Sequence, residues 1–223
     1  MSDTLNNALS LPERLGLNSD QFKQFWKQAR AKLRVCLPGV IQSFNATLQT
    51  AVVQVAVLEK TNQNINGALV AQDQDIKLLN DVPVLVLQGS TVALTMPVAA
   101  GDECLLIIAD YCIDAWWQAG GTGNAQLTKR RHDISDAFAI VGPNSKPTAL
   151  ASYSTTAAEL RTVDNSVKVS VGAAGVEVTG KVGFYGTAPI AKPVVTGSKG
   201  GNAALTSLLV ALANMGLITN STT

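Results

Sequence analysis

The single histidine of the chain, His132, lies in a charged run between Arg131 and Asp133. Ser135 follows closely, so a Ser-His-Asp triad is one interpretation of this segment. The serine lacks the G-x-S-x-G turn that exposes a hydrolase nucleophile. We therefore expect a charged loop, in which arginines and aspartates pair and position the chain, and no catalytic residue.

Two carboxylates, Asp110 and Asp114, precede a pair of tryptophans, Trp116 and Trp117. Glycosidases place two acids across a cleft, so these aspartates are a second candidate for catalysis. We expect instead a loop that anchors the two indoles, with the acids as caps or as ion-pair partners of Arg130–Arg131. No enzymatic activity is predicted.

Metal and phosphate sites also have little support. The three cysteines, Cys36, Cys104 and Cys112, include no C-x2-C pair of the kind that structural zinc sites use. Their apolar neighbours predict free, buried thiols. The glycine-rich run at 120–124 lacks the Lys-Ser/Thr ending of a phosphate-binding loop. The sequence therefore predicts no metal and no cofactor.

The composition is that of a globular protein. Of the 223 residues, 47% are hydrophobic and 15% are charged, and the formal net charge is +1. The strongly basic surface of a nucleic-acid-binding protein is therefore not expected. The first ten residues are polar, which predicts no signal peptide. No apolar run reaches the roughly 20 residues that cross a bilayer.

Residues 1–34 are predicted to form a helical segment, with the helix between residues 11 and 33. Phe22, Phe25 and Trp26 fall on one face of it, at spacings of three and four. That face either covers its own domain or docks to a partner. The three aromatic residues are our candidates for docking.

Residues 35–145 change to short alternating strands. Five or six strands are expected, at 40–44, 50–58, 83–87, 92–96, 103–109 and 137–141. That number of short strands in about 100 residues predicts a small closed barrel of the OB type. An SH3-like barrel is the alternative.

Residues 146–198 contain short runs of alternating apolar residues between glycines. Val169, Val171, Val176 and Val178 form apolar rows that so short a segment cannot cover. The segment either packs on the barrel or intertwines with copies of itself. We expect the second, a trimeric β-prism or β-helix shaft with these valines in its core.

Residues 199–223 predict a short helix that begins after Asn202 as N-cap and ends before Gly216. An apolar seam runs along the helix at spacings of three, four and three: Leu205, Leu208, Leu212 and Met215. A helix of about 13 residues is marginal alone in water, so it folds back on its own chain or bundles with other copies. Bundling at the end of the shaft is the preferred prediction.

Several spaced motifs between residues 37 and 144 resemble one family. In order they are LPGVIQSF at 37–44, AVVQV at 51–55, PVL at 83–85, LTMPV at 94–98, GDE at 101–103, DAWWQAG at 114–120 and RHDISDA at 131–137. They look like the N-terminal domain of phage membrane-piercing baseplate spikes, the central spikes of contractile tails. The loop that carries the last two motifs contains Trp116, Trp117, Arg131, His132 and Asp133.

A second stretch is similar to a C-terminal segment that many phage tail-fibre and other virion structural proteins share. It runs from GFYGTAPIAKP at 183–193 through GSKGGNAA at 197–204 to residues 217–218.

The spike resemblance implies a homotrimer, with the OB domain under the tail-tube hub and a β-helical shaft that points at the host envelope. Such spikes often end in a tip where histidines of three chains hold iron, but this chain has no histidine after His132. The implied partners are further copies of the chain, the tail hub and baseplate proteins, and the host envelope, without nucleic acid. The implied location is the baseplate of the virion, after synthesis in the host cytoplasm.

The combined prediction is a mainly β protein, with an N-terminal helix, an OB-like barrel, a trimeric shaft and a short C-terminal helix. Its predicted role is that of a central baseplate spike that docks to the hub and contacts or punctures the host envelope on contraction. The alternative is a tail-fibre-like attachment protein that binds a host surface glycan through the loop with Trp116 and Trp117.

Overall fold

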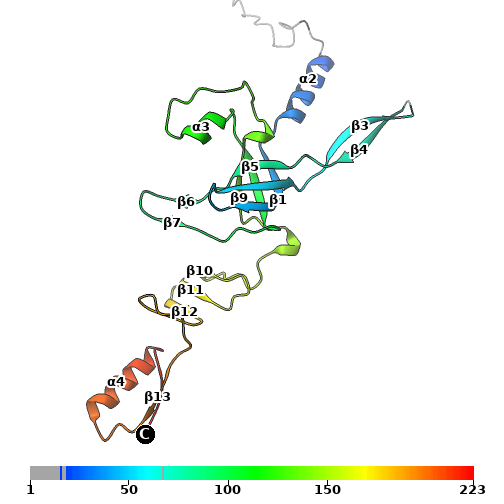
Figure 1. Cartoon of the computed structure of the whole chain (residues 1–223). Helices are drawn as coiled ribbons and strands as arrows, with labels where there is room; N and C mark the ends of the chain where they lie inside the picture. Colours follow the sequence, from blue (N-terminus) through cyan, green and yellow to red (C-terminus); the bar gives the residue numbers. More distant parts are fainter. Residues whose placement is uncertain (1–15, 17–18, 67) are drawn as a thin grey trace, which may run out of the picture. The chain divides into compact units, whose positions relative to one another are not determined.

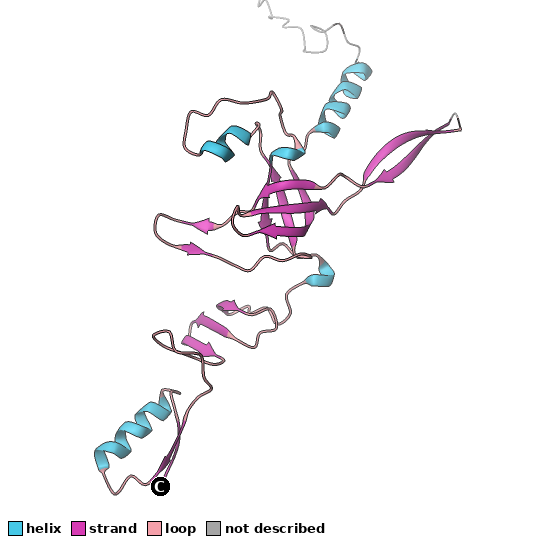
Figure 2. Ribbon diagram, viewed as in Figure 1, coloured by secondary structure: helices cyan, strands magenta, loops and turns pink. Residues whose placement is uncertain are grey.

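The structure is a computed structural model that describes residues 16, 19–66 and 68–223. These residues are mainly β (Figure 2), which confirms the predicted class. The chain divides into two compact units, Met1–Pro147 and Thr148–Thr223. The finer division into four segments stays a prediction. Within the described part of the chain, no helix has the length and apolarity to cross a membrane.

A curled sheet of five antiparallel strands forms the centre of the first unit (Figure 1). Its order is β5 (Leu79–Pro83), β2 (Thr50–Val55), β1 (Cys36–Asn45), β8 (Glu103–Ile108) and β9 (Ala137–Val141). Just after β5, a parallel bridge joins Val84 to Ala139, and the Leu85 N–H donates to the Ala139 carbonyl at 2.8 Å. The two outer strands therefore approach each other, and the sheet is a half-barrel.

The core of the first unit lies inside this curl. Alternate residues of each strand point inward, so the burial of β2 and β8 follows a period of two. Ile41, Val53 and Leu106 are fully buried. Burial of each such side chain contributes about 1.5–3 kcal/mol to folding.

Two of the predicted strands need correction. The strand predicted at 83–87 was wrong, because the strand is Leu79–Pro83, with Leu79, Val82 and Pro83 buried. Pro83 pairs with Thr50 of β2, and the next residue, Val84, bridges Ala139 of β9. The range 92–96 shrinks to β7 (Ala93–Leu94), which pairs only with β6 (Leu87–Gln88).

Sequence analysis did not predict the β3–β4 hairpin. It consists of β3 (Glu59–Ile65) and β4 (Ala68–Gln74), which pair over seven rungs. Nearly all of its residues are exposed, and β3 is polar on both faces. Without a buried face there is no alternation in the sequence from which to predict the strands.

Helical segments among the described residues complete the first unit, and a 3-10 turn (Lys146–Thr148) lies at its end. Helix α2 (Ser19–Lys32) is the described part of the predicted N-terminal helix, and residues 11–15, 17 and 18 of that prediction lie outside the described residues. Helix α3 (Asp114–Ala119) lies between β8 and β9, and a 3-10 turn (Ile134–Asp136) leads into β9.

The second unit contains two small sheets. The first is antiparallel, in the order β10 (Ala157–Arg161), β11 (Lys168–Gly172) and β12 (Gly175–Thr179). The second pairs β13 (Val194–Gly197) with β14 (Thr219–Thr222) in parallel. Helix α4 (Ala203–Asn214) supplies the crossover that a parallel pair needs.

The predicted C-terminal helix is confirmed together with its caps. The Asn202 side chain accepts a hydrogen bond from the Leu205 N–H at 3.0 Å. Gly216 follows the helix with φ of +78°, a conformation that glycine adopts without steric cost.

The three cysteines are free, but the prediction that all are buried was wrong for one of them. Cys104 and Cys112 are buried, and burial raises the pKa of the Cys104 thiol to about 11. Cys36 is exposed. It begins β1, where the alternation of the strand turns Leu37 inward and Cys36 outward.

Gly39 gives a test of the close packing in the half-barrel. A Cβ atom at this position would lie 2.7 Å from Val53 Cγ1, whereas one at Gly89 would meet nothing closer than 4.0 Å. We expect Gly39→Ala to lower the free energy of unfolding by about 1–3 kcal/mol, and Gly89→Ala to leave it nearly unchanged. All three tryptophans lie in the first unit, so their fluorescence in a urea titration reports this unit alone. Equal midpoints for the two variants would contradict the packing described.

Candidate assembly surfaces

Arg130 fixes the long loop between β8 and β9. Its guanidinium donates to both oxygens of Asp136, at 2.9 and 3.0 Å, and to Asp114 Oδ2 at 2.8 Å. Asp136 is fully buried and also accepts the Ile113 N–H at 3.1 Å. The arginine therefore compensates a buried charge and ties the start of α3 to the start of β9.

The same cluster resembles a metal site in its ligand types. The Cys112 sulfur and one carboxylate oxygen each of Asp114 and Asp136 lie within 4.8 Å of one another. The Arg130 guanidinium, however, contacts all three, with Nη2 lying 3.2 Å from the Cys112 sulfur. The positive charge that a cation would bring is already supplied by the protein, so we interpret the cluster as structural.

The neighbouring charged residues pair as the sequence predicted. Asp110 contacts Arg131 at 3.2 Å and His132 Nε2 at 2.9 Å. The Ser135 hydroxyl donates instead to Asp133 at 2.6 Å. Serine and histidine thus use different carboxylates, which is not the arrangement of a Ser-His-Asp triad.

The two tryptophans of α3 lie on this fixed loop. Trp116 packs edge-on against Phe138 of β9, with ring centroids 5.8 Å apart, and Trp117 lies 6.3 Å from Trp116. The tryptophans remain 43% and 39% exposed. The loop anchors the indoles as predicted, and the glycan-binding alternative stays a prediction.

Helix α2 carries an aromatic cluster that is open to solvent. Trp26 contacts Phe22 and Phe25 edge-on, with centroids 6.0 and 6.3 Å apart. Phe25 and Trp26 are 56% and 46% exposed. Helical spacing places three exposed cations along one side of this cluster: Lys23, Lys27 and Arg30.

The β10–β12 sheet of the second unit exposes its apolar face. The register aligns Leu160, Val169 and Val178 in one row and Ala158, Val171 and Val176 in the next. All six residues point to the same side of the sheet and all are exposed, the leucine and valines by 41% to 70%. The predicted valines therefore lie together on one surface.

The opposite face of this sheet is polar and better covered. Glu159 contacts Lys168 at 3.2 Å and Arg161 at 3.6 Å, and its side chain is 11% exposed. Ser170, between the two exposed valines of β11, is buried. Antiparallel sheets normally cover the apolar face and leave the polar one in water, so this sheet is inverted.

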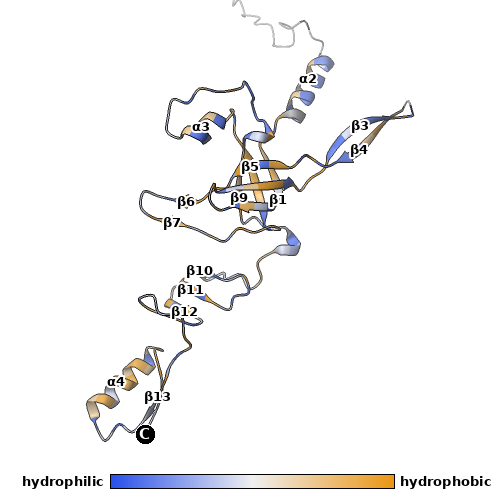
Figure 3. Ribbon diagram, viewed as in Figure 1, coloured by the Kyte–Doolittle hydropathy of each residue, from blue (hydrophilic) through white to orange (hydrophobic). Residues whose placement is uncertain are grey.

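Helix α4 divides its apolar residues between two sides. Figure 3 shows hydrophobic residues along α4. Leu209 is buried, and α4 packs on β14 of its own chain. The helix therefore folds back, as the alternative prediction had it. Three members of the predicted seam stay open to solvent, Leu205, Leu208 and Met215, whereas Leu212 is half-buried. Bundling through them stays a prediction.

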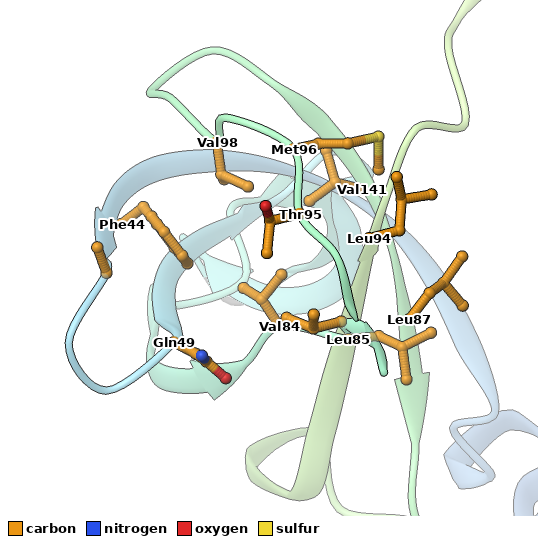
Figure 4. Close-up of a pocket in the computed structure, with 12 residues that line it drawn as sticks. Phe44, Gln49, Val84, Leu85, Leu87, Leu94, Thr95, Met96, Val98 and Val141 are labelled. Carbon is orange, nitrogen blue, oxygen red and sulfur yellow. The ribbon is translucent and has the colours of Figure 1, made fainter. Parts of the chain in front are cut away.

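An apolar pocket of about 230 Å³ lies at one end of the half-barrel (Figure 4). Phe44, Val84 and Val98 face the same space, and Leu87 and Leu94 border it from the ribbon formed by β6 and β7. Sequence reasoning missed the pocket, because its residues at 83–87 and 92–96 alternate as strands do.

A family model matches part of the chain. Residues 37–142 match the model described as the N-terminal domain of phage protein Gp138, which covers the half-barrel and its loops. No curated protein matches the chain. The match supports a structural protein of a bacteriophage.

Loss of Arg130 should destabilise the first unit strongly. Arg130→Met leaves the carboxylate of Asp136 buried without a counter-ion, so we expect unfolding to become easier by about 3 kcal/mol. Arg131→Met is the matched control, because its partner Asp110 is 54% exposed and such a pair contributes about 1 kcal/mol or less. Tryptophan fluorescence in urea measures both. Similar losses in the two variants would argue against the buried pair.

The Asp114 carboxyl should make stability depend on pH. Hydrogen bonds from Arg130 and then Cys112 hold its pKa below the ordinary value. A lowered folded-state pKa stabilises above the unfolded pKa of about 3.9 and ceases to do so as the pH falls through the folded value. The advantage of the wild type over Asp114→Asn, about 1 kcal/mol or less because the side chain is 41% exposed, should thus hold from pH 7 to about 5 and decline as the pH falls below the unfolded pKa of about 3.9. Urea midpoints at these pH values measure it, and an advantage that grows on acidification would contradict the sign.

Proposed function

We propose that the chain is the central spike of a phage tail baseplate and acts as a homotrimer. In this proposal the half-barrel is an OB-like domain that docks to the tail hub. The second unit builds a short shaft that contacts or punctures the host envelope when the tail contracts. The family match over residues 37–142 supports the phage part of this proposal.

The observation that carries the proposal is the β10–β12 sheet, whose apolar face is exposed and whose polar face is covered. Three such sheets around a threefold axis form a prism with their apolar faces inside and their polar faces outside. Each half-exposed valine or leucine that becomes covered contributes about 1 kcal/mol.

Hub docking is assigned to α2. Its cluster of Phe22, Phe25 and Trp26 has the form of a helix face that enters an apolar groove of a partner. The row of Lys23, Lys27 and Arg30 beside it favours a groove with acidic residues on that side. A 14-residue helix is marginal alone, so such contacts would also stabilise it.

The proposed role is mechanical and not enzymatic. The charged residues that could do chemistry contact one another: Arg130 binds Asp114 and Asp136, and Asp110 binds Arg131 and His132. The exposed side of α4, with Leu205, Leu208 and Met215, is proposed to close the end of the shaft.

The native mass and one pair of variants test the trimer. The wild type should have three times the mass of one chain in size-exclusion chromatography with light scattering. Val178→Asp places a charge inside the prism at a cost of several kcal/mol per ion and should yield single chains. Thr179→Asp changes the next residue, on the polar face opposite Lys168, and should remain trimeric. A wild type that is monomeric at micromolar concentration would contradict the proposal.

A further inference from the structure

We propose that Glu103 is a positioning residue, whose carboxylate holds a strap, residues 142–145, against the half-barrel and so sets the course of the chain where it leaves the first unit. The first unit ends at Pro147, just after the strap. The contact lies wholly inside the first unit. Only the use assigned to it, a fixed start for the proposed shaft, rests on the proposed function.

Glu103 contacts the strap at both of its ends. Its backbone carbonyl accepts a hydrogen bond from the Gly142 N–H at 3.3 Å. Its carboxylate accepts both donors of Ser145, since the hydroxyl donates to Oε1 at 2.7 Å and the backbone N–H donates to Oε2. An ionised carboxylate offers two acceptor oxygens, so one side chain can satisfy both groups. Glu103 is itself held as the first residue of β8, where it pairs with Val40 of β1.

Apolar packing beneath the strap is incomplete. All four strap residues are exposed. A pocket of about 230 Å³ is lined by Pro143, Asn144 and Ser145 together with residues of β1 and β8. Side chains that face such a space lose contacts on that side, so packing contributes little to the position of the strap. Hydrogen bonds to a charged acceptor are stronger than neutral ones, which makes the Glu103 carboxylate suited to hold the end of the strap.

The backbone of this segment limits how it can move once Ser145 is bound. Gly142 has φ of +125°, a conformation that favours glycine, and the chain turns there directly after β9. Pro143 and Pro147 restrict their own φ angles to about −65°. The 3-10 turn Lys146–Thr148 follows the latch at once. The second unit therefore begins at a held end of the chain, as a shaft that receives force from the half-barrel requires.

A spin label beside the strap measures the latch in the full chain. The starting variant is Cys36→Ser, which removes the exposed thiol and leaves the buried thiols of Cys104 and Cys112. Lys146→Cys is added, because this exposed residue directly follows Ser145 and can carry a nitroxide. The electron paramagnetic resonance line shape gives the fractions of held and mobile label on the nanosecond scale. Tryptophan fluorescence in urea gives the stability of the first unit for the same samples.

Two substitutions of Glu103 should release the label by different amounts. Glu103→Gln keeps the size of the side chain but replaces one accepting oxygen by an NH2 group, so only one donor of Ser145 keeps its acceptor. We expect the ratio of held to mobile label to fall by about 2- to 10-fold, and Glu103→Ala to lower it further. The matched control is Glu59→Gln, which removes a different carboxylate of the first unit, the partner of Arg34, and should leave the ratio unchanged.

The urea midpoint of Glu103→Gln should stay close to that of the starting variant, because the lost contact is exposed. Equal label mobility with Glu103, Gln and Ala at this position would overturn the inference. A gain in mobility that comes with a matching drop in the urea midpoint would also overturn it, because Glu103 would then act through the stability of β8. The native mass decides the spike proposal separately, so either proposal can fail without the other.

Discussion

The apolar face of the β10–β12 sheet is the constraint on which the proposed biology depends. A sheet that covers Glu159 and Ser170 while it exposes Val169 and Val171 leaves apolar surface in water, which costs free energy. Hydrogen bonds join its three strands, whereas its exposed apolar side chains would need further apolar surface to cover them. In the proposed trimer, assembly is therefore part of the folding of the second unit and not a later step.

In the described residues, the charged groups of one loop are paired within the chain, whereas several apolar surfaces are exposed. The charged groups of the loop between β8 and β9 are compensated locally, since one side chain, Arg130, contacts Cys112, Asp114 and Asp136. The apolar groups of α2, the ribbon and the second-unit sheet are left open. Paired charged groups and exposed apolar surfaces are what the proposed structural role in an assembly requires.

Sequence analysis predicted an element correctly where only one structure produces the observed residue pattern. The strand at 137–141 and the α4 helix with its Asn202 cap follow from alternation and capping, and both lie where predicted. It failed where one pattern has two causes, as at 83–87, where apolar alternation comes from a pocket wall. The β3–β4 hairpin left no pattern at all. The pairing of Asp114 with Arg130 was foreseen, but the full burial of Asp136 depends on tertiary structure that spacing does not encode.

The β3–β4 hairpin has a consequence for motion. Its seven rungs hold no buried side chain, and the ion pair between its two strands, Lys60 with Asp73, is solvent-exposed. At its base, Glu59 pairs with Arg34 at 2.6 Å. Local unfolding of the hairpin therefore costs little free energy and leaves the core at Ile41 and Leu106 untouched. Its amide protons should exchange with solvent long before those of β1 and β8. The hairpin can thus change its conformation on a surface that it meets without weakening the domain that carries it.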